Sequence, residues 1–172
     1  MRLPALTVAI ILVTGVLLFM LVELQLSWFN ERALRAKGAI EPPDDVIGLM
    51  RVAYPGAFLL MGIESALHGS LSRDLVLAGL LLLGWSKALK FWAIASLGGR
   101  WSYRVLVLPG APLVATGPYR FLRHPNYIAV MGELLSVALA LAAPVTGTLA
   151  LVTFAWLLSR RIACEERALG LR

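Results

Sequence analysis

The chain alternates between long apolar blocks and shorter polar segments. Its first apolar block, Leu3 to Val22, carries no charge over about 20 residues, enough to cross a ~30 Å hydrocarbon core as a helix. A backbone in lipid must satisfy its own hydrogen bonds, so open spans are helical. The blocks predict five helices, at residues 3–29, 46–67, 74–96, 127–143 and 145–162.

A secretory signal peptide is the alternative interpretation of the first block. The apolar core of a signal peptide has only ~7–15 residues and precedes a small-residue cleavage site. Here the run is longer, and aromatic and cationic residues suited to a membrane interface follow it, namely Trp28, Phe29 and Arg32. We therefore expect a retained helix.

The second block has the weakest helical pattern, and capping residues help to place its start. Three residues interrupt it, namely Arg51, Pro55 and Glu64. Asp44 or Asp45 can cap the second helix, and Ser72 can cap the third. Only the turn at Ala143-Pro144 separates the last two blocks, so these helices should be antiparallel neighbours.

Composition supports an all-α polytopic membrane protein. Of 172 residues 59% are hydrophobic, and the mean hydropathy is +0.80, more apolar surface than a soluble domain of this size could bury. We expect one membrane domain, residues 1–172, with N-terminal helices in 1–84. The single Cys164 excludes an internal disulfide. His68 and His124 lack metal-ligand spacing, so we expect no protein-bound metal.

The distribution of Lys and Arg predicts the orientation. A net charge of +6 and a pI of about 10.1 are typical of proteins that bind nucleic acid. However, alternate loops differ sharply: one side holds Arg2 and Arg73. The other holds nine cations, Arg32, Arg35, Lys37, Arg100, Arg104, Arg120, Arg123, Arg167 and Arg172. The positive-inside rule then places loops 30–45 and 97–126 in the cytoplasm and explains the pI without nucleic acid.

Several charges fall within or at the ends of the predicted spans. Seven lie in the cytoplasmic half: Glu23, Arg51, Lys87, Lys90, Glu133, Arg160 and Arg161; Glu64 lies toward the outer end. Such groups are costly in a membrane and usually pair or line a cavity. The lysines and Arg51 can instead extend their charged ends to the interface. Glu133 cannot do so easily and needs a partner, so we expect a polar pocket at the cytoplasmic end.

The segment GPYRFLRHPNY, residues 117–127, joins a basic loop to the fourth helix. Gly117 can take a positive φ, and Pro125 suits the first helical turn. His124 then lies at or near the N-cap, where the helix dipole disfavours a protonated ring. A neutral imidazole and free backbone N–H groups suit a polar or anionic ligand. An interfacial belt with a capping histidine is an equally good interpretation of the residues alone.

A second polar cluster closes the last helix. Arg161 and Glu165 are four residues apart, which predicts an i,i+4 ion pair. With Arg160 and Glu166, these groups could bind a ligand that carries an amine and a sulfonium. Taken alone, the cluster is more typical of a solvated helix end.

Together, GPYRFLRHPNY, a helical hairpin and RRIACEERAL resemble the isoprenylcysteine carboxyl methyltransferase family of integral membrane enzymes, over roughly residues 85–172. Related C-terminal halves occur in phospholipid N-methyltransferases and membrane sterol reductases. The resemblance implies that S-adenosylmethionine binds in a cytoplasm-facing pocket formed by the last helices and this loop, without a Rossmann domain. The chain has no strand–helix G-x-G-x-x-G segment.

The same resemblance implies roles for individual residues. Arg160 or Arg161 would orient the methyl acceptor, with a slight preference for Arg160 because Arg161 has a possible ion-pair partner. Seven residues would contact the cofactor or shape its site: Tyr119, Arg123, His124, Pro125, Tyr127, Glu165 and Glu166.

The acceptor implied is a prenylcysteine carboxylate or a long-chain phenol or pyrone lipid, entering from the bilayer. Small family members share a lead-in similar to RVLVLPGAPLVATGPYR, and many Leu, Ala and Arg residues with few Lys fit a GC-rich bacterial genome, hence a bacterial inner membrane. Two other functions stay open: a nicotinamide-dependent membrane reductase with the same C-terminal motif, and a non-enzymatic membrane scaffold.

The orientation can be tested by cysteine labelling. With Cys164 replaced, a cysteine at Ala111 should resist impermeant thiol reagents on intact cells and react after permeabilisation. Labelling of this cysteine from outside intact cells would overturn the predicted orientation.

Overall fold

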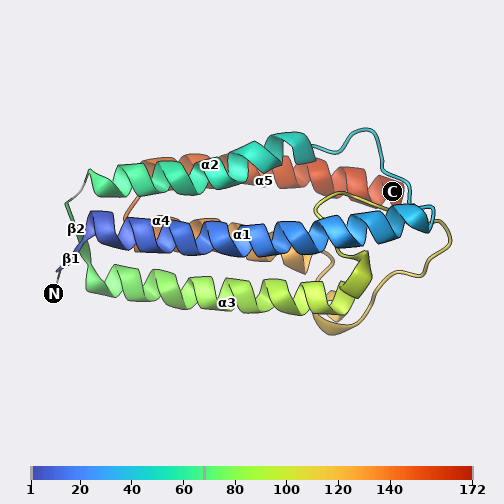
Figure 1. Ribbon diagram of the computed structural model, residues 1–172, viewed down its shortest axis with the longest axis horizontal. Helices are drawn as coiled ribbons and strands as arrows, with labels where there is room; N and C mark the ends of the chain where they lie inside the picture. Colours follow the sequence, from blue (N-terminus) through green and yellow to red (C-terminus); the bar gives the residue numbers. More distant parts are fainter. Residues whose placement is uncertain (1, 68, 172) are drawn as a thin grey trace.

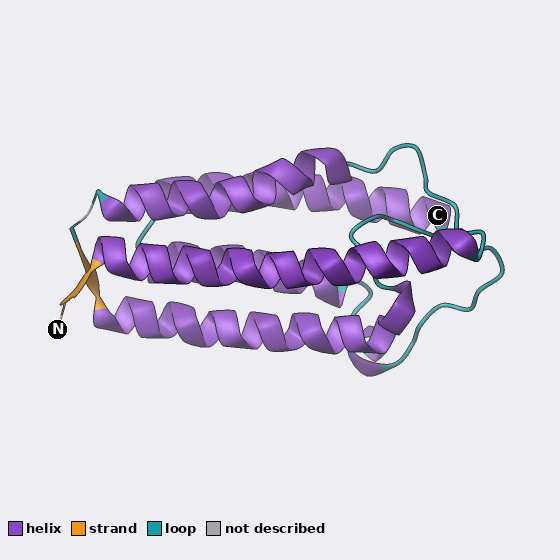
Figure 2. Ribbon diagram, in the orientation of Figure 1, coloured by secondary structure: helices purple, strands orange, loops and turns teal. Residues whose placement is uncertain are grey.

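Five long helices form the protein, confirming the all-α class (Figures 1 and 2). The computed structural model describes residues 2–67 and 69–171. The helices are α1 (Ala5–Ala36), α2 (Ile47–Ala66), α3 (Arg73–Leu97), α4 (Pro125–Ala140) and α5 (Pro144–Ala168). The shorter elements are the strands β1 (Arg2–Pro4) and β2 (Ser70–Ser72) and the 3-10 turns η1 (Gly98–Arg100) and η2 (Gly117–Arg120).

The connections segregate to opposite ends of the bundle. The N-terminus, β1, β2 and the α4–α5 turn lie at one end, while the α1–α2 loop, the long loop before α4 and the C-terminus lie at the other (Figure 1). At this second end, Ile40 and Val107 exchange two backbone hydrogen bonds, of 2.9 and 3.0 Å. The loops rich in Lys and Arg therefore share one end, as their distribution indicated; which end faces the cytoplasm stays a prediction.

The helices differ in their ability to cross a bilayer. Four of them, α1, α2, α3 and α5, are long and apolar enough to do so. The exception is α4, whose 16 residues rise about 24 Å, against a hydrocarbon core of ~30 Å. It stops short of the loop end that α1 and α5 reach (Figure 1). The five predicted helices are present, but only four have the length expected of a full span.

Several helix boundaries differ from the predicted ones, and α4 ends at Ala140 instead of residue 143. Both α1 and α5 continue by six or more residues past their apolar blocks, because the polar sequences NERALRA and ACEERA are rich in good helix formers. At the N-terminus the predicted helical start is wrong: Leu3 and Pro4 belong to β1, which pairs antiparallel with β2. The predicted turn around His68 includes one residue outside the described part of the chain.

The predicted helix caps are only partly observed. Ser72 is the N-cap of α3, but its hydroxyl makes no capping hydrogen bond. Val46 is the N-cap of α2, while Asp45 Oδ1 accepts a 3.2 Å hydrogen bond from the Ile47 N–H. Asp45 therefore satisfies the first turn of α2 from just outside the helix.

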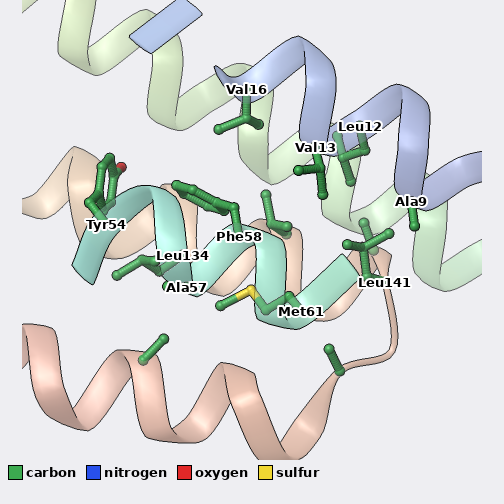
Figure 3. Packing of buried hydrophobic residues seen from close by; sticks show 14 of the residues in the cluster. Ala9, Leu12, Val13, Val16, Tyr54, Ala57, Phe58, Met61, Leu134 and Leu141 are labelled. Carbon is green, nitrogen blue, oxygen red and sulfur yellow. The ribbon is translucent and has the colours of Figure 1, made fainter. Parts of the chain in front are cut away.

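The apolar core joins α1, α2, α4 and α5 (Figure 3). Phe58 and Met61 of α2 are fully buried in this core, together with Leu134 of α4 and Leu141, the C-cap of α4. Small residues allow α3 and α4 to approach closely, since a Cβ on Gly79 would lie 2.5 Å from that of Ala140. Many other large apolar side chains face outward, as expected of a bundle surrounded by lipid.

Four buried charges from α1, α3 and α4 form a closed ring. Lys87 Nζ lies 3.0 Å from Glu23 Oε1 and 3.1 Å from Glu133 Oε2. Lys90 Nζ lies 2.7 Å from Glu23 Oε2 and 3.2 Å from Glu133 Oε1, the last contact being an ion pair without hydrogen-bond geometry. The signs alternate, so this charge ring is neutral. It gives Glu133 the partners it requires, and both lysines pair instead of reaching the interface.

Two tyrosine hydroxyls extend the charge ring to other elements. Tyr54 of α2 donates a 2.8 Å hydrogen bond to Glu133 Oε2, and Tyr103 of the long loop donates one of 3.0 Å to Glu23 Oε2. The charge ring thus connects four helices and the loop. Arg51, in contrast, is exposed.

Neutrality of the charge ring should govern its stability. Lys90→Met or Glu133→Gln alone leaves an uncompensated buried charge and should lower the free energy of unfolding by ~3–5 kcal/mol. The double variant restores neutrality and should lose clearly less than the sum of both. Denaturant titration in detergent micelles measures this, with the exposed Lys37→Met as the matched control. Strictly additive losses would contradict the coupling.

Candidate active site

A large cavity lies at the loop end of the bundle, with a volume of about 1320 Å³. Most of its wall is apolar and includes Leu17, Met20 and Leu24 of α1 and Met50 and Pro55 of α2. Polar groups from two distant segments also line it, namely Tyr119, His124, Asn126, Tyr127, Arg161 and Glu165. The cavity is therefore amphiphilic, with the sequence motif on its polar side.

Gly117 fixes the turn that begins the motif. Its φ is +58°, as predicted, and a Cβ here would collide with Ser96 Oγ, so both conformation and space require glycine. The following turn, η2, buries Pro118 and directs Tyr119 toward the cavity. Burial, with the nearby charge of Glu165, raises the pKa of the Tyr119 hydroxyl and keeps it protonated.

His124 is the N-cap of α4, and Pro125 begins the helix. Its Nδ1 lies 3.6 Å from Glu165 Oε2, and its Nε2 lies 3.4 Å from Glu166 Oε1. Hydrogen bonding to Glu165 is the main cause that raises the pKa of His124, aided by the charges of both glutamates and opposed by burial. The direction of this shift is opposite to the one expected from the helix dipole alone, because two carboxylates lie beside the ring.

Tyr127 links the two polar clusters. Its ring stacks on that of His124, with centroids 5.4 Å apart and planes 13° from parallel. Its hydroxyl donates a 2.7 Å hydrogen bond to Glu165 Oε2 and accepts one of 3.0 Å from Arg161 Nε. The structure thus joins side chains of the motif to the end of α5.

The predicted i,i+4 ion pair of Arg161 with Glu165 is replaced by another. Arg161 Nη1 donates to Asp45 Oδ1 at 2.9 Å, and Nη2 donates to the backbone carbonyl of Tyr103. Since Tyr127 accepts from Nε, three groups outside α5 bind one guanidinium. This arrangement leaves Glu165 to Tyr127 and His124.

The remaining predicted residues take less central positions. Arg123 and Arg160 are exposed and, within the described chain, are not among the residues lining the cavity. Pro125 is buried at the start of α4, and Glu166 is buried against His124. Between the two candidate arginines, the geometry places Arg161 at the cavity and Arg160 on the outer surface. The roles of all these residues stay predictions.

Sequence reasoning missed three contributors to the site. Asp45 was considered only as a helix cap, and Asn126 only as part of the motif. Tyr103 is held at three points: its N–H donates to Ser27 Oγ at 2.8 Å, its hydroxyl binds Glu23, and its carbonyl accepts from Arg161. Burial and Glu23 raise the pKa of its hydroxyl. No spacing in the sequence signals these contacts, which join segments far apart in the chain.

Comparison with known proteins matches the site-bearing half of the chain to a family. Residues 77–170 match the model of the Isoprenylcysteine carboxyl methyltransferase (ICMT) family. An uncharacterized protein of Bacillus subtilis (strain 168), YpbQ, is 33% identical over 147 residues, covering 86% of this chain and 88% of the relative. An uncharacterized protein of Haemophilus influenzae is 28% identical over 149 residues, covering 86% of this chain and 87% of the relative. No solved structure matches significantly.

The protonation of His124 can be measured directly. In a His68→Asn background, NMR titration of the remaining imidazole should give a pKa above the usual value of about 6.5. Glu165→Gln should lower it. A raised pKa means that the stabilisation from protonated His124 is complete below about pH 6.5 and is lost as the pH rises through the raised value. A pKa at or below 6.5 would contradict the ion pairs described here.

Proposed function

The chain belongs to the isoprenylcysteine carboxyl methyltransferase family, and we propose that it transfers a methyl group from S-adenosylmethionine to an oxygen of a lipid-tailed acceptor. The family makes membrane methyl transfer the reaction class. The observation that carries the finer proposal is the amphiphilic cavity, whose polar side holds His124, Tyr127, Arg161 and Glu165.

The polar side of the cavity fits S-adenosylmethionine. The Glu165 carboxylate lines it and suits the positive amino and sulfonium groups of such a ligand. Asn126 Oδ1 is buried and has no hydrogen-bond partner among the described residues, so it offers an unused acceptor to an amino group. When bound, the cofactor supplies an electrophilic methyl group. His124, Asn126, Tyr127 and Glu165 would hold it.

The size of the cavity supports two ligands. A volume of about 1320 Å³ exceeds the ~300–1,000 Å³ typical of a pocket for one small molecule. The apolar wall formed by α1, α2 and the long loop would receive the acceptor tail, while the acceptor head would lie on the polar side. The prenylcysteine carboxylate and the long-chain phenol or pyrone share this form, and both would enter from the bilayer.

The protein residues would act mainly by positioning. Arg161 lines the cavity, and its planar guanidinium suits a carboxylate or phenolate oxygen. Methyl transfer to such an oxygen depends on alignment and on exclusion of water more than on proton transfer by the protein. Arg160 is exposed, so we now favour Arg161 for this role. The relatives are bacterial, which supports a bacterial inner membrane. The distribution of Lys and Arg supports a site that faces the cytoplasm.

The proposal is tested with purified protein in detergent. Calorimetry with S-adenosylmethionine should show binding, which His124→Ala and Glu165→Gln should each weaken roughly tenfold to a hundredfold through loss of a partly buried hydrogen bond. Labelled methyl should pass to a prenylcysteine or to a long-chain phenol or pyrone. Arg161→Lys should lower single-turnover rates more than cofactor affinity, because Lys lacks the two-pronged donor geometry.

Arg160→Lys is the matched control, since it makes the same exchange one residue away on the exposed side and should cause the smaller loss. A parent protein that neither binds S-adenosylmethionine nor transfers methyl would refute the proposal. Binding of a nicotinamide cofactor instead would favour the reductase, and binding of neither cofactor would favour the scaffold.

A further inference from the structure

We propose that Asp45 is a positioning residue that holds the Arg161 guanidinium at the cavity and away from Glu165. This inference rests on the proposed function, in which Arg161 orients the methyl acceptor. It assigns a role in the site to the α1–α2 loop, which precedes the family match at residues 77–170.

Asp45 makes three polar contacts that fix its carboxylate. Oδ1 accepts from Arg161 Nη1 at 2.9 Å and from the Ile47 N–H at 3.2 Å. Oδ2 accepts from the Val105 N–H at 3.1 Å. These bonds connect the start of α2, the long loop and α5. The carboxylate therefore has one fixed orientation toward the guanidinium.

The contact between Asp45 and Arg161 is shielded from water. The side chain of Asp45 is 3% exposed, and that of Arg161 is 6% exposed. A charge-assisted hydrogen bond in such surroundings is stronger than one at a wet surface. Removal of the carboxylate leaves a buried guanidinium with a strong need for another anion.

Without the Asp45 carboxylate, Glu165 is the anion with which Arg161 would pair. It lies one helical turn further along α5, at the spacing that favours an ion pair on one helix face. In the structure, Glu165 instead accepts from Tyr127 and lies beside His124. Loss of Asp45 would therefore let Arg161 turn to Glu165 and disturb both the acceptor side and the cofactor side of the site.

Asp45 itself lies outside the wall of the cavity. Arg161 lines the cavity, whereas Asp45 is absent from the cavity wall formed by the described residues. A ligand in the cavity would therefore touch Arg161 but not Asp45. The effect of Asp45 on methyl transfer must then pass through Arg161, which distinguishes it from a catalytic residue.

The test is a double-mutant cycle on single-turnover methyl transfer at saturating cofactor. Asp45→Asn keeps the shape and one acceptor oxygen but removes the charge, and should lower the rate about tenfold or more in the parent. In an Arg161→Lys background, the same change should have a much smaller effect. Asp45→Glu, which keeps the charge, should recover more of the rate than Asp45→Asn does.

The neighbouring Asp44 provides a matched control. Its side chain is 71% exposed, and its carboxylate lies 3.6 Å from the exposed Arg167. Asp44→Asn should keep the rate within about twofold of the parent, as expected for a surface change. Thermal unfolding of every variant separates a general loss of stability from the loss of rate.

The outcomes separate the inference from the proposed function. An inactive parent refutes the proposed function before any variant is compared. An active parent with an unchanged rate in Asp45→Asn overturns the role of Asp45 alone. Equal losses from Asp45→Asn with and without Arg161→Lys would also overturn it, since they would mean that Asp45 acts only as a structural anchor.

Discussion

The neutralisation of charge inside an apolar bundle is the constraint on which the rest of this structure depends. A buried charge requires a partner within a few ångströms, because neither lipid nor the core can solvate it. The charge ring meets this requirement for Glu23, Lys87, Lys90 and Glu133, and Asp45 meets it for Arg161. The two members of every pair come from different segments of the chain, so the need for neutrality also fixes how helices and loops lie together.

Tyr103 connects the two sets of charges. Its hydroxyl binds the charge ring through Glu23, and its backbone carbonyl accepts a hydrogen bond from Arg161. The long loop is thereby fixed between the centre of the bundle and the cavity. A site built on such a loop needs this support, since loops are otherwise the most mobile parts of a fold. The buried charges thus serve the site although only some of their side chains reach the cavity.

The contacts divide the candidate site into a cofactor side and an acceptor side. His124, Tyr127 and Glu165 form one connected group on the side assigned to the cofactor. Arg161 joins this group through the Tyr127 hydroxyl but takes its ion pair from Asp45. Cofactor affinity and acceptor alignment would therefore respond to different substitutions, even though all of these side chains lie within one network.

The sequence by itself determined the helices, their order and the two polar clusters, because apolar length, turn residues and local motifs are properties of neighbouring positions. It correctly placed Gly117 in a left-handed turn and required a partner for Glu133. Only the tertiary structure decided the partners. The sequence favoured Glu165 for Arg161, four residues away, but the fold brings in Asp45, 116 positions away. It also reversed the expected direction of the shift in the pKa of His124, since two glutamates of α5 approach the ring. Pairing across a bundle depends on how helices pack, and no local spacing encodes that.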